Sequence, residues 1–349
     1  MKAYVLHNIN EFRLESVEKP ILKPDEVLVE VKAAGICGSD IPRIFKTGSY
    51  FYPLIPGHEF SGIVVKIGES LDENWLGKRV GVFPLIPCME CIPCQNTQYE
   101  LCRDYSYLGS RRDGGFAEYV AVPAKNLIEL PENVSYEAAA MLEPMAVVVH
   151  AMRSIMINRD DKVVVLGLGT IGVLLTMFLK EANINNLLVI GNKDFQKEMA
   201  LKLGISEEYY YDSRNQKVEE WIKYHTENLG ANVFFECVGK NETITTAINC
   251  TAPNGIVQLI GNPDSDINFN KNTYWKILRN QLRVKGSWNS SFTNRSDDDW
   301  HYVLERLKKG KIDPEQYITH KFSFEELEKG LSIMRDKSEE YIKLMITRY

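Results

Sequence analysis

The sequence contains 349 residues, more than one hydrophobic core usually accommodates, so two domains are expected. Its 41 Lys and Arg residues against 47 Asp and Glu give a net charge of −6, which argues against nucleic acid or an anionic membrane as the main partner. No apolar run is long enough to cross a bilayer, and the chain starts on a strand-like segment without a signal-peptide pattern, so a cytoplasmic location is expected.

The first third of the chain has the period-two alternation of short strands, interrupted by proline and glycine. This pattern occupies residues 1–33 and returns at 60–68, 79–83 and 116–122. Alternation of this kind, broken by turn residues, is typical of a half-buried antiparallel sheet. The N-terminal part is therefore predicted to be a β-rich, barrel-like domain.

Three potential metal ligands flank the loop between the first and second of these strand segments. Cys37 lies in the motif A-G-I-C-G-S-D, and His58 and Glu59 lie in P-G-H-E-F-S-G. Thiolate, imidazole and carboxylate are the donors that zinc accepts, and a catalytic zinc site keeps one position open. Because a buried cysteine and a core histidine are the more common explanation of an isolated pair, the prediction of a Lewis-acid centre depends on the further motifs below.

A second group of cysteines lies between the strand segments, within a lobe at about 86–104. Cys88, Cys91, Cys94 and Cys102 are separated by short gaps and can close a tetrahedron around zinc without an open position, as in a structural site. An iron–sulfur cluster is the alternative, since runs with two-residue gaps also bind clusters. In a chain without an export signal, disulfides are less expected than metal ligation.

The middle of the chain changes to helical and then to alternating strand and helix patterns. Glu143 lies in an otherwise apolar helical segment, where an ionised carboxylate needs a cation, so it is a further potential zinc ligand; a solvated carboxylate at a helix end is the alternative. The strand at 163–166 leads into a glycine-rich turn and an apolar helix. Further strands at 187–190, 233–238 and 255–260 predict a parallel, doubly wound sheet.

The glycine-rich turn has the G-x-G-x-x-G pattern of a dinucleotide site. Glycines allow the backbone to approach a pyrophosphate, and the helix N-terminus offers free N–H groups. The acid that would hold the ribose 2′-hydroxyl of NAD is missing after the next strand, which ends Gly191, Asn192, Lys193. NADP is therefore favoured over NAD, unless Asp194 or another group serves NAD. The predicted coenzyme residues are Gly167, Leu168, Gly169, Thr170, Ile171, Gly172, Asn192 and Lys193.

The last part of the chain is amphipathic and polar, and it ends in an apolar strand at 341–346 that is expected to return to the first domain. The acidic run 297–299 is interpreted as a solvated helix start.

Taken in order, these motifs resemble the zinc-containing medium-chain dehydrogenases over nearly the whole chain. The resemblance implies a GroES-like β-barrel catalytic domain at 1–148 and 291–349, a Rossmann coenzyme domain at 149–290, and a homodimer or homotetramer assembled through the Rossmann sheets. It also implies two zinc ions per chain. Carried over by position, the catalytic zinc ligands are Cys37, His58 and Glu143, with Glu59 as an alternate ligand or water-holding group, and the structural zinc ligands are the four lobe cysteines.

The stretches G-S-D-I-P-R-I-F-K-T-G and L-G-S-R-R-D-G-G-F-A-E-Y are similar to family members that act on sugar-alcohol phosphates of the galactitol 1-phosphate type. The expected reaction is hydride transfer between a secondary alcohol and a nicotinamide coenzyme, with Ser39 relaying the hydroxyl proton unless it only caps the next turn. A substrate phosphate needs charge-assisted partners. The candidates are Arg43, Lys46, Arg111 and Arg112.

Three alternatives remain open at this point. One is NADPH-dependent reduction of a ketose phosphate to a pentitol phosphate. Another is a sorbitol-type enzyme acting on an unphosphorylated polyol. The third, from a different class, is a non-catalytic protein that binds zinc and nucleotide.

Overall fold

The computed structural model describes residues 1–263 and 265–348. The chain forms two compact units: unit 1 comprises Met1–Ala146 and Ser290–Tyr349, and unit 2 comprises Val147–Asn289. The sequence placed these boundaries after residues 148 and 290. Among the described residues, no helix combines the length and apolar composition that a membrane span requires.

Unit 1 is built on a seven-stranded sheet in which the long strand β3 (Glu26–Ile36) is central. The main order is β16-β17-β3-β4-β5-β9, and β8 also pairs with β3. Only β16 and β17 are parallel to each other; the other pairs are antiparallel. The remaining strands of the unit are β1 (Lys2–Asn8), β2 (Glu11–Ser16), β4 (Glu59–Ile67), β5 (Arg79–Val82), β6 (Leu85–Ile86), β7 (Ser106–Tyr107), β8 (Tyr119–Pro123), β9 (Leu127–Glu129), β16 (Ile318–Ser323) and β17 (Lys343–Thr347).

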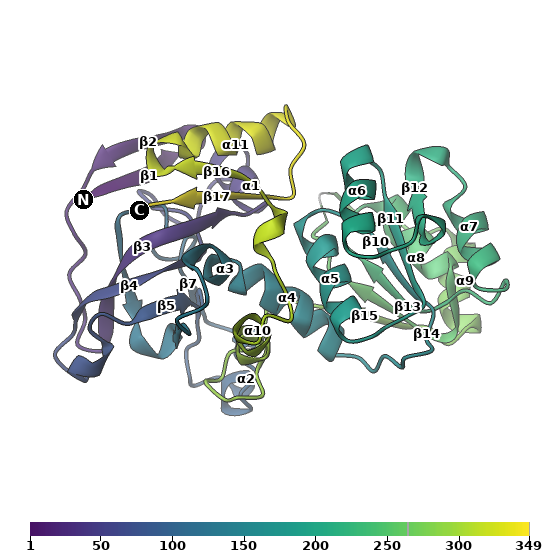
Figure 1. Ribbon diagram of the computed structural model, residues 1–349, viewed down its shortest axis with the longest axis horizontal. Helices are drawn as coiled ribbons and strands as arrows, with labels where there is room; N and C mark the ends of the chain where they lie inside the picture. The colour runs from purple at the N-terminus through teal and green to yellow at the C-terminus, as the bar shows by residue number, and fades with distance from the viewer. Residues whose placement is uncertain (264, 349) are drawn as a thin grey trace. The chain divides into compact units, whose positions relative to one another are not determined.

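The core of unit 1 is formed by the inward-facing residues of these strands, including Val29, Phe60 and Leu344. The last strand, β17, lies antiparallel to β3 within this sheet, as expected for a chain that returns to its first unit (Figure 1). The helices of the unit are α1 (Asp40–Phe45), α2 (Ile92–Gln95), α3 (Tyr136–Ala140), α4 (Leu142–Arg153), which continues into unit 2, α10 (Asp299–Lys308) and α11 (Leu327–Asp336).

Unit 2 is a six-stranded, wholly parallel sheet in the order β12-β11-β10-β13-β14-β15. This order reverses next to β10, and helices lie on both faces of the sheet, so the predicted doubly wound architecture is confirmed (Figure 1). Its elements are β10 (Val163–Leu166), α5 (Thr170–Glu181), β11 (Leu187–Gly191), α6 (Asp194–Lys202), β12 (Tyr210–Asp212), α7 (Val218–His225), β13 (Ala231–Glu236), α8 (Asn241–Asn249), β14 (Thr251–Leu259), α9 (Lys271–Arg279) and β15 (Arg283–Gly286).

The acidic run before α10 is a helix start, but the prediction that it is solvated is wrong for Asp298 and Asp299. Both are buried. Asp298 is the N-cap, and its carboxylate accepts the backbone N–H groups of His301 and Thr293. The Asp299 carboxylate accepts the N–H of Ser291. These residues are acidic because they satisfy backbone donors in the interior.

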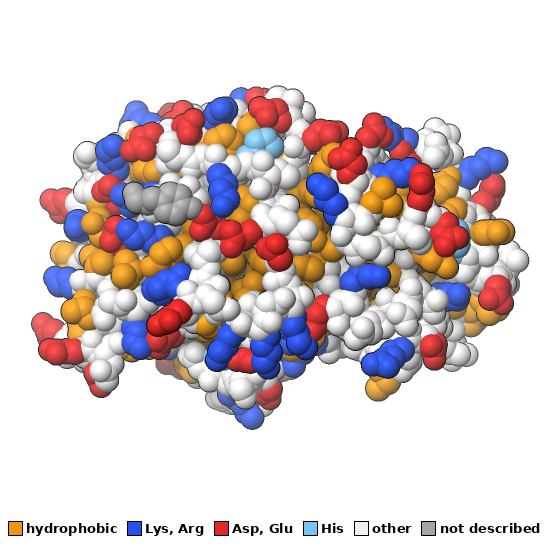
Figure 2. Space-filling model, in the orientation of Figure 1, with side chains coloured by type: hydrophobic (Ala, Val, Ile, Leu, Met, Phe, Trp, Pro, Cys, Tyr) orange, Lys and Arg blue, Asp and Glu red, His pale blue; other side chains and the backbone are white. Residues whose placement is uncertain are grey.

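On the face of the molecule that Figure 2 shows, acidic and basic side chains are interspersed rather than segregated. A nucleic-acid-binding face would carry a concentrated basic patch. The visible surface is therefore consistent with the small negative net charge.

Candidate functional site

The first potential metal centre lies where β3 ends and β4 begins. The two strands pair antiparallel with Gly35 opposite Glu59, so Cys37, just after β3, is brought beside His58 and Glu59. Donor atoms of these three residues all lie within 4.8 Å of one another. His58 is only 5% exposed, and among the described residues its Nδ1 has no hydrogen-bond partner. A buried imidazole beside a thiol and a carboxylate supplies the donor types that fit a zinc ion.

Asp40 connects the two sides of this centre. One carboxylate oxygen accepts the backbone N–H of Cys37 at 3.0 Å, while the other lies 3.7 Å from His58 Nδ1 and 3.2 Å from an Arg43 nitrogen. Histidine ligands usually direct their second ring nitrogen at a carboxylate, which fixes the ring. Asp40 is suited to that role, and Arg43 compensates its buried charge.

The Glu59 carboxylate has a second partner that the sequence did not indicate. Lys343 of β17 contacts Glu59 Oε2 and donates to the carbonyl of Ile36 at 3.0 Å, and both charged side chains are 2% exposed. Burial lowers the pKa of Lys343, whereas the nearby charges of Glu59 and Cys37 raise it. The second effect is larger, so the pKa of Lys343 lies above its usual value. A Cβ at Gly35 would collide with both members of the pair, so this position requires glycine.

Glu143, at the start of α4, is buried as predicted, with only 7% of its surface exposed. Burial raises its pKa to about 7, with His58 acting against this shift and Glu59 reinforcing it. The Tyr107 hydroxyl donates a hydrogen bond to the Glu143 carboxylate at 3.2 Å. The ring centroid of Tyr107 lies 5.8 Å from that of His58. Glu143 is thus near the centre, although it is outside the set of donors within 4.8 Å.

Of the remaining predicted residues, Ser39 donates its hydroxyl to Cys37 Sγ at 3.3 Å. It occupies the N-cap position of α1 without forming a side-chain cap, so the capping alternative does not explain it. Arg112 pairs with the buried Glu26 at 2.7 Å. Lys46 is exposed, and no ion pair of the described residues includes it.

Arg111 is held between two aromatic rings. Its guanidinium carbon lies 4.5 Å from the ring centroid of Tyr50 and 4.3 Å from that of Tyr105. One guanidinium nitrogen also donates to the Tyr105 carbonyl at 3.1 Å. Since the Tyr105 ring packs edge-on to Tyr107 at 6.2 Å, a row of aromatic side chains connects Arg111 with the metal centre.

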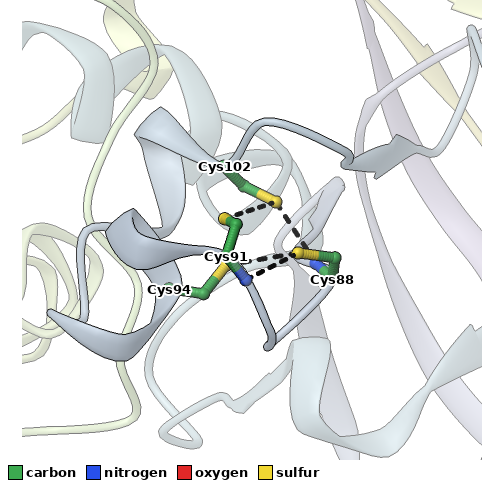
Figure 3. A group of neighbouring side chains, drawn as sticks. All are labelled: Cys88, Cys91, Cys94 and Cys102. Atoms are coloured by element: carbon green, nitrogen blue, oxygen red, sulfur yellow. Dashed lines mark hydrogen bonds between the residues drawn. The ribbon is translucent and has the colours of Figure 1, made fainter.

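The four lobe cysteines point toward one another (Figure 3). Cys88 Sγ lies 3.9 Å from Cys94 Sγ, and Cys91 Sγ lies 3.9 Å from Cys102 Sγ. Zinc–sulfur bonds of about 2.3 Å in a tetrahedron separate the sulfurs by roughly 3.8 Å. Backbone N–H groups, first that of Arg103, lower the pKa of Cys91 to about 6, which favours its thiolate. This spacing fits one ion better than a cluster, whose several metal atoms would hold the sulfurs farther apart.

The glycine-rich turn of unit 2 has the geometry that a pyrophosphate site needs. Gly167 has φ of +100°. A Cβ on Gly172 would collide with the carbonyl oxygen of Gly167, so α5 packs closely against the turn. Gly169 is the N-cap of α5, and a Cβ there would meet nothing within 4 Å. The backbone is therefore open at the helix N-terminus, where phosphate is attracted.

The comparisons with known proteins agree with this geometry. A family model described as "Alcohol dehydrogenase GroES-like domain" matches residues 23–132, and one described as "Zinc-binding dehydrogenase" matches 170–309. The chain belongs to the zinc-containing medium-chain dehydrogenases, and the predicted GroES-like and Rossmann architecture is confirmed. It is accordingly an oxidoreductase of the alcohol and polyol dehydrogenase type that uses a nicotinamide coenzyme.

Among its relatives, galactitol 1-phosphate 5-dehydrogenase of Escherichia coli (strain K12) is 33% identical over 311 residues, 89% of each chain. Sorbitol dehydrogenase of Bacillus subtilis (strain 168) is 28% identical over 352 residues, 99% of this chain and 97% of the relative. The crystal structure of galactitol-1-phosphate dehydrogenase from Escherichia coli superposes with a TM-score of 0.92 at 31% identity and covers all of both chains.

Three residues of the centre escaped the sequence analysis: Asp40, Tyr107 and Lys343. Asp40 could have been found from its place three residues after Cys37, within reach of the same loop. Lys343 is the charged residue within the otherwise apolar run 341–346, a position where a charge is unusual, which is a signal that a buried partner exists. Tyr107 gave no signal.

Proposed function

We propose that this protein is a zinc-dependent dehydrogenase that transfers a hydride between a sugar-alcohol phosphate and NADP. The observation that carries the proposal is the donor set of Cys37 and the buried His58 and Glu59, in a chain similar to a galactitol 1-phosphate 5-dehydrogenase. The experiment is a panel of hexitol and pentitol phosphates with their ketose partners, each assayed with both coenzymes.

Charge balance supports the assignment of Cys37, His58 and Glu143 as the catalytic zinc ligands. A thiolate and one carboxylate neutralise a divalent ion. The second carboxylate, Glu59, is neutralised by Lys343, and Asp40 is neutralised by Arg43. Buried charges are tolerated when each has a partner. Glu59 then stands beside the metal as an alternate ligand rather than a permanent one.

Zinc in this site would supply a Lewis acid that polarises the substrate oxygen and lowers the pKa of the alcohol. The chain's own groups would orient the substrate and move its proton. The Ser39 hydroxyl, adjacent to the Cys37 sulfur, is the group we assign to accept the substrate hydroxyl proton and pass it outward. Burial, followed by the Glu143 charge, raises the pKa of Tyr107 well above its usual value, so its hydroxyl remains a donor that orients Glu143.

For the substrate phosphate we favour Arg111 and Lys46 among the four basic candidates. Arg43 and Arg112 each already pair with a buried carboxylate, so their charges serve the fold. Arg111 is instead held by tyrosine rings, which leaves charge available for a dianion.

We therefore expect R111Q and K46Q each to raise KM for the phosphorylated substrate by about 10–100-fold, because a charge-assisted hydrogen bond contributes about 1.5–3 kcal/mol. The KM of the unphosphorylated polyol should stay within about twofold. R43Q, which also leaves the Asp40 charge without its partner, should impair turnover of both substrates. If R111Q and K46Q raise KM equally for the phosphorylated and the unphosphorylated substrate, neither side chain binds the phosphate.

Two enzymatic alternatives are separated by the same panel. A ketose-phosphate reductase making a pentitol phosphate would prefer five-carbon phosphates and NADPH. A sorbitol-type enzyme, suggested by the similarity to sorbitol dehydrogenase, would turn over free polyols as well as their phosphates. A non-catalytic protein would turn over none of them, whereas two zinc ions per chain and loss of turnover on chelation would support catalysis.

We also propose that the protein is a homo-oligomer assembled through unit 2. β15 is the last strand of the parallel sheet, and within the described residues its outer edge is unpaired. All four of its residues are exposed. Tyr274 and Leu278 of α9 and the nearby Trp288 are also exposed. A bare strand edge with apolar neighbours favours pairing with a second copy of the chain.

A further inference from the structure

A basic group that the sequence did not indicate, Arg214, follows the strand β12 beside the carboxyl end of β11. In a Rossmann sheet this end lies beside the coenzyme ribose, where an acid binds the 2′-hydroxyl of NAD or an arginine accommodates the 2′-phosphate of NADP. The last residue of β11, Gly191, lies opposite Asp212 of the parallel strand β12. Arg214 follows two residues later, so its side chain starts next to the ribose position.

The Arg214 guanidinium is held firmly by Asp212 and only weakly by Asp194. Its Nε donates to both carboxylate oxygens of Asp212, at 3.0 and 2.8 Å, and Nη2 contacts Asp212 and Asp194. The Asp212 side chain is 23% exposed, whereas the Asp194 side chain is 85% exposed. An exposed ion pair contributes little to stability, so Asp194 is a partner that a phosphate dianion can displace.

The place of the missing acid is occupied by other side chains. A Cβ on Gly191 would lie 2.7 Å from the Tyr210 hydroxyl and 2.9 Å from Gln196 Oε1. Gln196 is buried and accepts the backbone N–H of Asn192 at 2.9 Å. An acidic side chain at Gly191 would require the Tyr210 hydroxyl and the Gln196 amide to shift, so the place of the NAD-type acid is filled by neutral polar groups.

Lys193, the basic residue that the sequence indicated, is held by fewer contacts than Arg214. Its ammonium lies 5.4 Å from the ring centroid of Phe195 and makes no ion pair among the described residues. Arg214 is thus the better oriented cation at this end of the sheet.

We propose that Arg214 binds the 2′-phosphate of NADP(H) and determines the coenzyme preference. Asp212 positions its guanidinium, and the phosphate displaces the Asp194 carboxylate from it. This inference rests on the proposed NADP-linked function and adds its specificity-determining residue. Asp194 competes with the coenzyme for the same guanidinium, so removing its charge should strengthen binding.

The test measures coenzyme binding without substrate, by fluorescence titration of the full chain with NADPH and NADH. R214Q should raise the Kd of NADPH by about 10–100-fold, because a charge-assisted pair is lost, and leave the Kd of NADH within about twofold. D194N should lower the Kd of NADPH about threefold without changing that of NADH. R159Q, which removes an exposed arginine before the amino end of β10, is the matched control and should change neither.

Displacement of NADPH by 2′,5′-ADP and by 5′-AMP isolates the phosphate contact: R214Q should abolish the preference for 2′,5′-ADP. Equal weakening of NADPH and NADH in R214Q, or no gain in D194N, would overturn the role of Arg214. The D194N arm does not depend on a loss, so misfolding cannot imitate it. A wild-type protein that binds NADH more tightly than NADPH would instead refute the proposed coenzyme, whatever the variants do.

Discussion

At the scale of single residues, the most consequential contact is the buried pair of Lys343 and Glu59. Two opposite charges removed from water gain from each other only while both are present. The Ile36 carbonyl accepts a further hydrogen bond from the Lys343 ammonium, and Gly35 provides the space. The pair keeps a negative carboxylate beside the metal ligands without leaving its charge unbalanced.

Removing one member of this pair should therefore be more harmful than removing both. K343M should lower the free energy of unfolding by about 3–5 kcal/mol, because Glu59 remains buried and charged without a partner. The double variant K343M/E59Q should recover most of this loss. Urea unfolding of the zinc-loaded protein measures both values, and a K343M variant as stable as the wild type would contradict the pairing argument.

Single residues also show what sequence reasoning can reach. The clustering of Cys37 with His58, and of the four lobe cysteines with one another, could be predicted because donor type and spacing are local properties. Lys343 was not, because its role depends on β17 lying against β3 with Leu344 opposite Ile36. Strand register of this range is set by the whole sheet and not by neighbouring residues. The same limit hid Arg214, whose relevance appears only when β12 lies beside β11.

At the scale of elements, we expect the cysteine lobe to depend on its proposed metal for stability. Its helix α2 has four residues, and Met89, Ile92 and Leu101 are exposed, so few apolar contacts hold the lobe together. A segment without a core needs another source of stability, and coordination of a metal by the four cysteines would supply it.

Chelation should open this lobe before it unfolds either unit. Limited proteolysis of the chelated protein should give first cleavage between residues 86 and 104, and C94S should show the same cleavage without chelator. C250S, which alters a buried cysteine of unit 2, is the control and should be cleaved like the wild type. If the chelated protein is cleaved no faster in this lobe, the structural role of the metal is wrong.

At the scale of the whole molecule, the exposed edge of β15 predicts an assembly of at least two chains. V284K places a charge on this edge, where Val284 is 41% exposed, and should shift the protein to monomers because like charges meet across the two copies. V65K, on the partly exposed strand β4, is the matched control and should not. Light scattering after size exclusion gives the mass; a monomeric wild type at micromolar concentration would refute the assembly.

The position of Lys343 in the chain also has a consequence for biosynthesis. It is separated from Glu59 by 284 positions, and all of unit 2 is translated in between. At about 5–20 residues per second, a ribosome delivers the lysine roughly 15–60 s after the glutamate. During that interval the nascent catalytic unit lacks its last strand and the counter-charge of its carboxylate, so insertion of zinc is expected to follow synthesis of the coenzyme unit rather than precede it.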